Sequence, residues 1–290
     1  MFIGIIGNIH KSSVIGSIEL IVSELRENNI EFALAEELKN VLPKKDYDIS
    51  LFKPFNSILS SADMIISIGG DGTFLNTARL VGNSNVPILG INTGNLGFLA
   101  EIQLNEFKDF LENILNKKFR KVERVLLESV SANGEKLVAL NDIVIDKFDS
   151  IRMIEIELFY NEEKVYKCVA DGIIVSTPTG STGYSLSAGG PVISPRSKVF
   201  VISPICPHTL NIRPIVIPDD GKIEIRINTA CKIRITSDGQ EAIQIDSPSS
   251  IILKKADHCI NLIRKNDLTY FNTLKTKLFW GEDKRKNSKK

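Results

Sequence analysis

The residues best placed for chemistry lie in one glycine-rich segment, Gly69-Gly70-Asp71-Gly72-Thr73. It follows the apolar run 64–68 and precedes a helical pattern. Glycines let the backbone approach a ligand closely, and the start of a helix offers unpaired N–H groups and the positive end of a dipole, which together suit a phosphate. The carboxylate of Asp71 could accept a proton from an attacking hydroxyl, or hold a Mg²⁺ that rides on nucleotide phosphates. A tight Asp-Gly turn is the alternative, although a parallel strand that feeds a helix needs no hairpin turn.

A second cluster, rich in glycine and hydroxyl residues, runs from Asp171 to Gly190. Its Ser, Thr and backbone groups supply hydrogen-bond donors without bulk, which suits a ligand with several oxygens, and Tyr184 adds an aromatic face. A flexible loop is the alternative. Because the cluster begins at the end of an apolar strand and contains the stiffening Pro178, the pattern favours a binding loop.

Several common nucleotide-binding patterns are missing. Residues 7–12 have the wrong spacing for a Gly-x-x-x-x-Gly-Lys-Ser/Thr loop, and no Gly-x-Gly-x-x-Gly follows an expected strand. Both absences disfavour a P-loop ATPase and an ordinary dehydrogenase. The histidines, His10, His208 and His258, form no cluster, so we assign them no catalytic role, and we assign no metal ligands.

The elements that must position the glycine-rich segment alternate between strand and helix. Apolar runs predict strands at 2–6, 64–68 and 86–91, and apolar residues at helical spacing predict helices at 14–25, 73–80 and 107–115. Ser12 or Ser13 is the expected cap of the first helix, and Asn105 that of the last. This repetition predicts an α/β amino-terminal domain with a mostly parallel sheet.

From about Arg120 the pattern changes to strict alternation of apolar and polar residues, as at Ile223, Ile225 and Ile227. We therefore expect the α/β domain at 1–119, joined by 266–290, and a β-rich carboxy-terminal domain at 120–265. Helix-like spacing returns at 274–280, and the polar stretch 281–290 is expected to be disordered.

Composition limits the class of protein. The chain has 290 residues, 43% of them apolar and 24% charged, which excludes a disordered or fibrous protein and allows two packed cores. With 36 basic and 35 acidic side chains the formal net charge is +1, which argues against a nucleic-acid coat. The four cysteines form no Cys-x-x-Cys pair, and no run approaches the ~20 apolar residues that span a bilayer. We expect reduced, mostly buried thiols in a cytoplasmic protein that binds neither nucleic acid nor membrane.

Five motifs in register resemble one family, the NAD kinases. They are Gly69–Thr73, Asn92-Thr93-Gly94-Asn95-Leu96-Gly97-Phe98, Asn141-Asp142, Asp171 through Ser187, and Pro207-His208-Thr209-Leu210 with Arg213-Pro214. Their order and spread cover most of the chain. The resemblance implies transfer of the terminal phosphoryl group of ATP to the 2′-hydroxyl of the adenosine ribose of NAD⁺, giving NADP⁺. It also implies a divalent metal with the ATP, expected to be Mg²⁺.

The same resemblance implies roles for individual residues. Asp71 would be the proton acceptor, in a phosphate loop formed by Gly69, Gly70, Gly72 and Thr73. The implied NAD-binding residues are Asp71, Gly72, Phe98, Asn141, Asp142, Asp171, Thr182, Gly183, Tyr184, Ser185, Leu186 and Ser187, with Arg152 and Gln240 as weaker additions. Asp142 stands where the family often has Glu, and Gly183 where Ala is frequent. Val169 and Asn76 replace basic residues of some members, which leaves open how the pyrophosphate is neutralised.

Two other functions remain open. Diacylglycerol and sphingoid kinases look similar around a Gly-Gly-Asp-Gly-Thr loop, although the second half of this chain resembles NAD kinases. A non-catalytic dinucleotide sensor would keep both loops but has no use for a base at Asp71. The resemblance further implies a homodimer or homotetramer, and we expect the isoleucine-rich strands to supply part of its interface. Use of inorganic polyphosphate in place of ATP, and of NADH, is left open.

Overall fold

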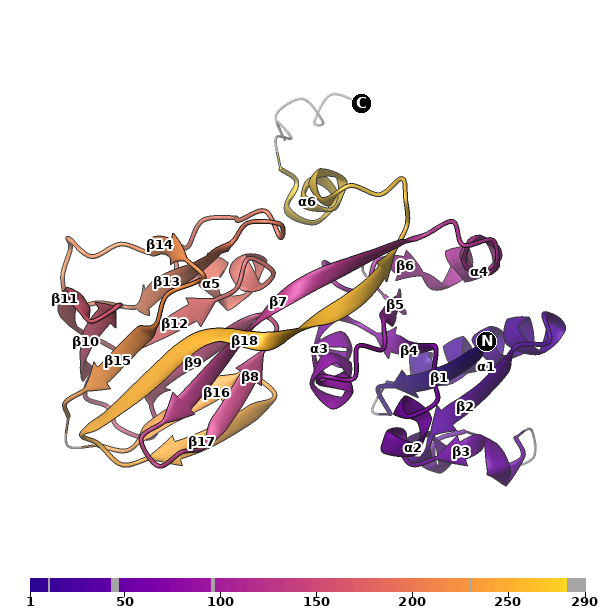
Figure 1. Cartoon of the computed structure of the whole chain (residues 1–290), viewed down its shortest axis with the longest axis horizontal. Helices are drawn as coiled ribbons and strands as arrows, with labels where there is room; N and C mark the ends of the chain where they lie inside the picture. The colour runs from indigo at the N-terminus through magenta and orange to yellow at the C-terminus, as the bar shows by residue number, and fades with distance from the viewer. Residues whose placement is uncertain (10, 43–46, 95–96, 230, 281–290) are drawn as a thin grey trace. The chain divides into compact units, whose positions relative to one another are not determined.

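The computed structural model describes residues 1–9, 11–42, 47–94, 97–229 and 231–280. The chain folds into two compact units, whose helices and strands are labelled in Figure 1. Unit 1 comprises Met1–Glu123 and the segment that begins at Asn261, and unit 2 comprises Arg124–Ile260. The expectations for His10, Asn95, Leu96 and the tail 281–290 fall outside the described residues.

Unit 1 is built on a parallel sheet, as its sequence pattern predicts. Neighbouring strands follow the order β18-β5-β4-β1-β2-β3, with β6 also on β5, and all of these pairings are parallel. The strands are β1 (Phe2–Gly7), β2 (Glu31–Ala35), β3 (Phe52–Lys53), β4 (Met64–Gly69), β5 (Ile88–Asn92), β6 (Ile102–Gln103) and the last part of β18 (Ser249–Arg264). Gly69 at the end of β4 is in register with Asn92 at the end of β5. The loops that follow these two strands therefore leave the same edge of the sheet.

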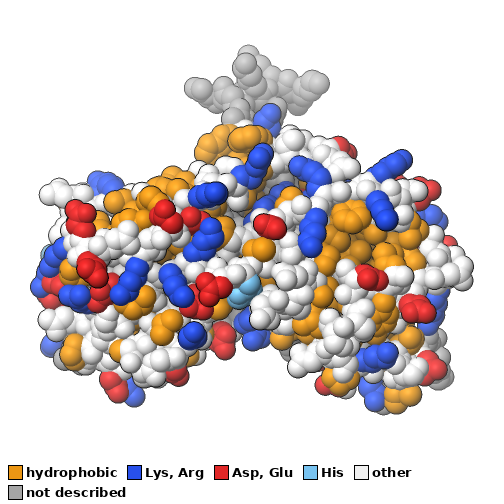
Figure 2. All heavy atoms as spheres, in the orientation of Figure 1, with side chains coloured by type: hydrophobic (Ala, Val, Ile, Leu, Met, Phe, Trp, Pro, Cys, Tyr) orange, Lys and Arg blue, Asp and Glu red, His pale blue; other side chains and the backbone are white. Residues whose placement is uncertain are grey.

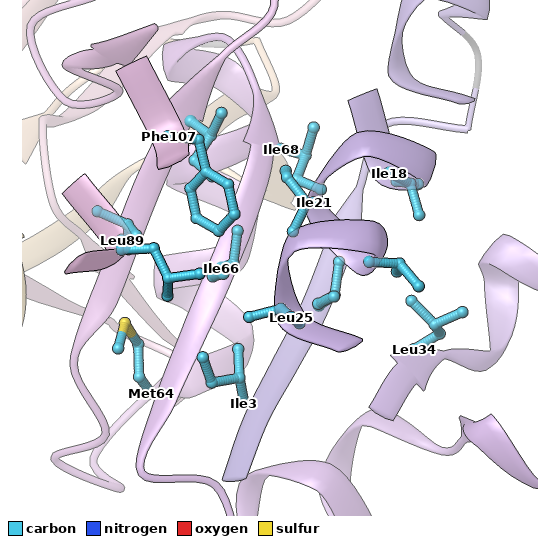
Figure 3. Packing of buried hydrophobic residues seen from close by; sticks show 14 of the residues in the cluster. Ile3, Ile18, Ile21, Leu25, Leu34, Met64, Ile66, Ile68, Leu89 and Phe107 are labelled. Atoms are coloured by element: carbon cyan, nitrogen blue, oxygen red, sulfur yellow. The ribbon is translucent and has the colours of Figure 1, made fainter. Parts of the chain in front are cut away.

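Helices cover both faces of this sheet. They are α1 (Ser12–Glu27), α2 (Phe55–Leu59), α3 (Asp71–Val81) and α4 (Phe107–Leu115), with 3-10 turns η1 (Glu36–Asn40), η2 (Ile49–Leu51) and η3 (Leu104–Glu106). A further helix of this unit, α6 (Tyr270–Leu278), follows β18. Ile21 and Leu25 of α1 lie against Ile3 of the sheet, in a core that α4 completes (Figure 3). On the opposite face, a side chain at Gly4 would collide with Ile58 of α2. Glycine at that position therefore lets α2 pack closely on β1.

Two expected helix caps are wrong. α1 begins at Ser12, so its cap position is Lys11, whose side chain makes no capping bond. Asn105 lies inside η3, where the carboxylate of Glu106 accepts a hydrogen bond from the backbone N–H of Gln103 at 3.1 Å. The helix after the glycine-rich segment, α3, begins at Asp71 rather than at Thr73. This earlier start places Asp71 in the first turn of α3.

Unit 2 consists of two layers of antiparallel strands that share one core. One layer has the order β14-β13-β12-β9-β16-β17, and the other contains β11-β10-β15-β18 with β7 and β8. The strands are β7 (Arg120–Ser131), β8 (Lys136–Ala139), β9 (Asp142–Lys147), β10 (Ile154–Tyr160), β11 (Glu163–Ala170), β12 (Gly172–Ser176), β13 (Val199–Ile205), β14 (Ile215–Pro218), β15 (Ile223–Ile227), β16 (Ile233–Ser237) and β17 (Glu241–Ile245). Two short helices, η4 (Gly180–Thr182) and α5 (Tyr184–Ser187), follow β12. The β-rich second half is confirmed.

The alternating isoleucines pack inside unit 2. Ile223 and Ile225 of β15 and Ile233 and Ile235 of β16 all have an exposed fraction of 0%. They belong to one cluster with residues of both layers, because each sheet covers the apolar face of the other. The expectation that these side chains form an interface between copies of the chain is therefore wrong.

The surface mixes charges of both signs. On the face shown in Figure 2, Lys and Arg side chains alternate with Asp and Glu, in keeping with the small net charge. Within the described ranges, none of the helices has both the length and the apolar character needed to cross a membrane. No disulfide joins the four cysteines, all of them described, but only Cys168 is fully buried and Cys206 is exposed. The expectation of mostly buried thiols is thus wrong.

Candidate active site

The glycine-rich segment forms a tight passage from β4 into α3. Gly69 has a φ of +152°, and the side chain of Thr73 occupies the space that a Cβ at Gly69 would need. Gly70 occupies the cap position, and Asp71 is the first residue of the helix. Around Gly70 and Gly72 an added Cβ would meet no atom within 4 Å. The outer side of this turn is therefore open, next to the N–H groups of the first turn of α3.

Three consecutive backbone amides hold the carboxylate of Asp71. Its Oδ2 accepts the N–H of Phe98 at 2.8 Å, and its Oδ1 accepts those of Leu99 at 3.0 Å and Ala100 at 3.1 Å. We call these three N–H groups the amide cradle of Asp71. An ionised carboxylate has about four acceptor positions, two on each oxygen. The cradle therefore uses both positions on Oδ1 and leaves one on Oδ2 for another donor.

The loop that carries this amide cradle is itself fixed in several ways. A Cβ at Gly97 would overlap the carboxylate of Asp71, so only glycine fits there. The side chain of Asn92 accepts the N–H of Gly94 at 2.7 Å and donates to the carbonyl of Ala100 at 3.4 Å. The same carbonyl accepts the N–H of Gly97 at 3.1 Å. The segment that begins at Asn92 thus supports Asp71 structurally, which its sequence alone does not reveal.

A second carboxylate, that of Asp238, is held in the same way in unit 2. Its Oδ2 accepts the N–H of Leu140 at 2.8 Å, and its Oδ1 accepts those of Asn141 at 2.7 Å and Asp142 at 3.1 Å. Asp238 has a φ of +51° in the turn between β16 and β17, and its own N–H donates to the carbonyl of Asp142 at 3.0 Å. We call the three donors the amide cradle of Asp238. It fixes the pair Asn141-Asp142.

The side chain of Asp142 lies in a low-dielectric, negatively charged setting. Its exposed fraction is 6%. Burial raises the pKa of Asp142 to about 7, and the neighbouring carboxylate of Asp238 adds to the rise. Burial also raises the pKa of Asp238, against the lowering effect of its three N–H donors. Asp142 therefore keeps its proton at a pH at which an ordinary aspartate is ionised.

A pocket of about 450 Å³ opens beside these two aspartates. Its lining consists of Asn141, Asp142, Val144, Asp146, Tyr184, Arg234, Thr236, Asp238, Gly239 and Ala242. The ring of Tyr184 is about half exposed, and Arg234 makes two bonds to Asp146, at 3.0 and 2.6 Å. The Oδ1 atom of Asn141 is buried and has no hydrogen-bond partner. We call this the Asp142 pocket; it combines an aromatic face, an unsatisfied acceptor and ionisable groups.

Many hydroxyls of the cluster from Asp171 to Gly190 point inward. The cluster begins with a buried strand, β12, and the hydroxyl of Thr177 donates to the carbonyl of Leu140 at 2.6 Å. Ser185 lies 3.1 Å from the hydroxyl of Ser203. A Cβ at Gly180 would overlap the backbone of Asn141. These hydroxyls therefore help to hold Asn141 in place, in addition to any bonds that they make to a ligand.

The expected NAD-binding residues are placed differently from one another. Asn141, Asp142 and Tyr184 line the Asp142 pocket, and a Cβ at Gly183 would lie 3.7 Å from Asp142 Oδ2. Asp171 instead forms an ion pair with Lys147 at 2.6 Å. The rest of the set lies outside the residues that line this pocket: Asp71, Gly72, Phe98, Arg152, Thr182, Ser185, Leu186, Ser187 and Gln240. Of these, Gly72, Arg152, Ser187 and Gln240 are exposed.

Sequence patterns do not single out three charged residues of this pocket, Asp146, Arg234 and Asp238. Asp146 and Arg234 face each other across β9 and β16, and this pairing is in register. The available signal was that each of these two charged residues directly follows an isoleucine within a strand, but its partner could be identified only once the strands were paired.

Comparisons with known proteins give a consistent result over both units. Residues 3–119 match the model of the ATP-NAD kinase N-terminal domain, and residues 140–265 match that of the ATP-NAD kinase C-terminal domain. An NAD kinase of Flavobacterium johnsoniae is 40% identical over 293 residues, covering 98% of this chain and 100% of the relative. One of Flavobacterium psychrophilum is 38% identical over 293 residues, with the same two coverages.

Solved structures agree. An NAD kinase from Archaeoglobus fulgidus in complex with ATP is 26% identical, with a TM-score of 0.75 over 95% of this chain and 98% of that one. Yeast NADH kinase complexed with NADH has a TM-score of 0.88, covering 98% of this chain and 89% of that one. At 24% identity, the yeast enzyme bears on the fold alone.

Proposed function

We propose a residue-level mechanism for this chain, which belongs to the ATP-NAD kinase family and phosphorylates NAD. The 2′-hydroxyl of the adenosine ribose of NAD⁺ attacks the terminal phosphorus of ATP, a new P–O bond forms, and the bond to the departing ADP breaks. NADP⁺ and ADP result. Such a transfer requires alignment, charge neutralisation and a group that takes the hydroxyl proton.

Asp71 is the group that takes this proton. The observation that carries the assignment is the amide cradle, which fixes both carboxylate oxygens and leaves one acceptor position on Oδ2. A hydroxyl that donates to this position is oriented for attack as its proton passes to Oδ2. Asp71 then releases the proton to solvent after ADP leaves. The cradle restricts the base to one geometry, which favours a single attack direction.

The open glycine turn is suited to bind the phosphates. An added Cβ at Gly70 or Gly72 would meet nothing within 4 Å, so a ligand can approach the backbone there. The first turn of α3 presents N–H groups at the positive end of the helix dipole. The divalent ion, Mg²⁺, would enter on the ATP phosphates, where it neutralises charge, as this ion commonly does. We assign it no ligands in the chain. Within the described ranges, no three His, Cys, Asp or Glu side chains lie together in a way that could hold a metal ion.

The Asp142 pocket is proposed to bind the adenosine part of NAD⁺. Tyr184 offers a half-exposed ring for the adenine, and the buried Oδ1 of Asn141 offers an unsatisfied acceptor to an amino group. The carboxylate of Asp142 accepts hydroxyls of the ribose. Asp171 and the residues from Thr182 to Ser187, with Phe98, Arg152 and Gln240, are retained as further contacts. Ser185 is the exception, because its bond to Ser203 supports a structural role.

The two other functions lack support. The family matches extend over both units, and the two Flavobacterium relatives are NAD kinases, so neither a lipid kinase nor a non-catalytic sensor is favoured. A homodimer or homotetramer is proposed on family resemblance, and light scattering at micromolar concentration tests it, a monomer counting against it. The cytoplasmic location and the use of polyphosphate stay predictions.

The decisive experiment measures NADP⁺ formed from NAD⁺, ATP and Mg²⁺, read through an NADP-specific dehydrogenase. Asp71→Asn is run beside the unmodified chain. Asp63→Asn is the matched control, because Asp63 also accepts a backbone N–H, that of Phe2 at 2.7 Å, but has no part in the proposed site. Activity lost in the first variant and kept in the second supports the role of Asp71. Near-normal turnover of Asp71→Asn would exclude it as the base.

A further inference from the structure

One buried ion pair adjoins the amide cradle of Asp71. Glu101 directly follows Ala100, the last donor of the cradle, and its side chain is 3% exposed. Its Oε2 accepts the Nε–H of Arg264 at 2.6 Å, and its Oε1 also contacts the second guanidinium nitrogen. The hydroxyl of Thr273 donates to Oε1 at 3.3 Å. A carboxylate 30 positions after the proposed base is thus bonded from two sides, by β18 and by α6.

We propose that Glu101 and Arg264 are positioning residues for the reaction: their ion pair sets the location of the amide cradle and, through it, of the Asp71 carboxylate. This inference rests on the proposed role of Asp71. It assigns a part in turnover to the carboxy-terminal segment, which contributes no residue to the glycine-rich loop.

The carboxy-terminal segment provides a fixed end. The guanidinium of Arg120 donates to the carbonyl of Lys265 at 3.2 and 2.9 Å and to that of Leu268 at 2.6 Å. Leu262 of β18 pairs with Ile88 of β5. Arg264 is therefore held by backbone and side-chain bonds on both sides along the chain.

The pair itself is rigid because it is buried and has two points of contact. The side chain of Arg264 is 10% exposed, so little water is available to replace a lost partner. The planar guanidinium meets the carboxylate through one hydrogen bond, from Nε, and one close ion-pair contact, from Nη2, which fixes angle as well as distance. A lysine lacks this planar fork. Thr273, 1% exposed, closes the remaining side. Glu101 consequently has one well-defined position.

The link to Asp71 is short and tightly packed. Glu101 lies between Ala100, whose N–H is bonded to Asp71, and Ile102 of β6, which pairs with Ile91 of β5. A Cβ at Gly90 would overlap the Cα of Ala100, so the loop rests directly on the sheet. A shift of Glu101 therefore cannot push Ala100 closer to the sheet and must displace it in another direction. Displacements of about 1 Å at a reacting group can cost on the order of 100-fold in rate.

The test uses two substitutions. Glu101→Gln keeps the shape of the side chain but loses its charge, and Arg264→Lys keeps the charge but loses the planar guanidinium. We expect kcat to fall roughly 10- to 100-fold with the KM for NAD⁺ and ATP nearly unchanged, because orientation of the base is lost and substrate contacts are not. Glu106→Gln is the matched control: it breaks the neighbouring ion pair between the same two segments, with Lys265, but not the one beside the cradle. Its kcat should stay within about twofold of the unmodified value.

A double-mutant cycle separates positioning from general support of the fold. If Glu101 acts through Asp71, Glu101→Gln must reduce the residual turnover of Asp71→Asn by much less than it reduces that of the unmodified chain. An equal reduction in both backgrounds, an unchanged kcat, or a rise in KM alone would overturn the inference while leaving the base role intact. If Asp71→Asn itself keeps its turnover, it is the proposed function that fails.

A further variant keeps the inference testable if the single substitutions prevent folding. Glu101→Leu with Arg264→Met removes both charges together, and such apolar replacements of a buried pair are often tolerated. This double variant should melt cooperatively, as followed by circular dichroism, and still show the 10- to 100-fold loss of kcat. A well-folded double variant with full turnover would contradict the positioning role.

Discussion

Asp71 in unit 1 and Asp238 in unit 2 are held by the same device. In each, one carboxylate oxygen accepts the N–H of the first of three consecutive residues and the other oxygen accepts the next two. The donors lie 27 to 29 residues after Asp71 but 96 to 98 residues before Asp238. Two segments of different sequence thus hold a carboxylate through the same pattern of backbone hydrogen bonds.

The two differ in what stands beside them. Asp71 is flanked by glycines that leave open space, so a ligand can approach its remaining acceptor position. Asp238 faces the buried Asp142 and raises the pKa of that side chain. The same kind of cradle therefore suits the proposed base in one unit and the support of the proposed NAD-binding loop in the other. The neighbours of a held carboxylate, more than its own bonds, thus decide its chemistry.

The largest expected effect separates catalysis from binding. Asp71→Asn should lower kcat roughly 10²- to 10⁴-fold, because the general base is lost, yet bind NAD⁺ with nearly unchanged affinity. Calorimetric titration of NAD⁺ into the variant measures the second part. A strong loss of NAD⁺ affinity in Asp71→Asn would contradict the proposed separation of roles, in which Asp71 takes the proton and the Asp142 pocket binds NAD⁺.

Asp142 should lower the stability of the free protein above neutral pH. Its pKa of about 7 in the folded chain exceeds the ordinary value of 3.8, so the folded state holds the proton more tightly. The free energy of unfolding then falls as pH rises from about 4 to 7, and this contribution is constant outside that window. Asp142→Asn should consequently be more stable than the unmodified chain at pH 8, by roughly 2–4 kcal/mol, and equally stable near pH 4.

Urea denaturation at the two pH values measures this difference. Asp146→Asn is the control, because Asp146 lines the same pocket but is paired with Arg234. An advantage of Asp142→Asn that is the same at both pH values would show that ionisation of Asp142 is not its cause.

Asp238→Asn should affect binding more than turnover. The amide offers one oxygen to three N–H groups and points its own NH₂ at the cradle, which costs about 1–3 kcal/mol. The loop of Asn141 and Asp142 loosens, and the KM for NAD⁺ should rise about 10- to 100-fold with kcat at saturation changed far less. Removing the negative neighbour should also lower the pKa of Asp142. Steady-state kinetics over a range of NAD⁺ concentrations checks this; a fall in kcat alone contradicts it.

The smallest expected effect comes from a single methyl group. Gly97→Ala places a Cβ against the carboxylate of Asp71, so the cradle must shift and kcat should fall about tenfold. Gly16→Ala in α1, where an added Cβ meets nothing within 4 Å, is the control and should raise stability by up to about 1 kcal/mol. Kinetics and thermal melting of both variants measure the contrast. Equal kinetics in the two variants would count against close contact at Gly97.

Patterns that depend on a few neighbouring residues were predictable from the sequence. An apolar run, then glycines, then apolar residues at helical spacing predicted β4, the loop and α3. This was possible because strands and helices each have a characteristic local period. Alternation at Ile223, Ile225 and Ile227 predicted β15 in the same way. Motifs in register were enough to indicate the NAD kinase family.

Contacts between distant segments were decided only by the tertiary structure. Nothing local in sequence marks Phe98, Leu99 and Ala100 as donors to Asp71, or joins Glu101 to an arginine 163 positions away. The expected interface of isoleucines failed for the same reason, since a periodic pattern shows that a face is apolar but not what covers it. Sequence therefore determined which side chains could do chemistry, and the fold, by bringing remote backbone amides to two carboxylates, decided how each is held and what stands beside it.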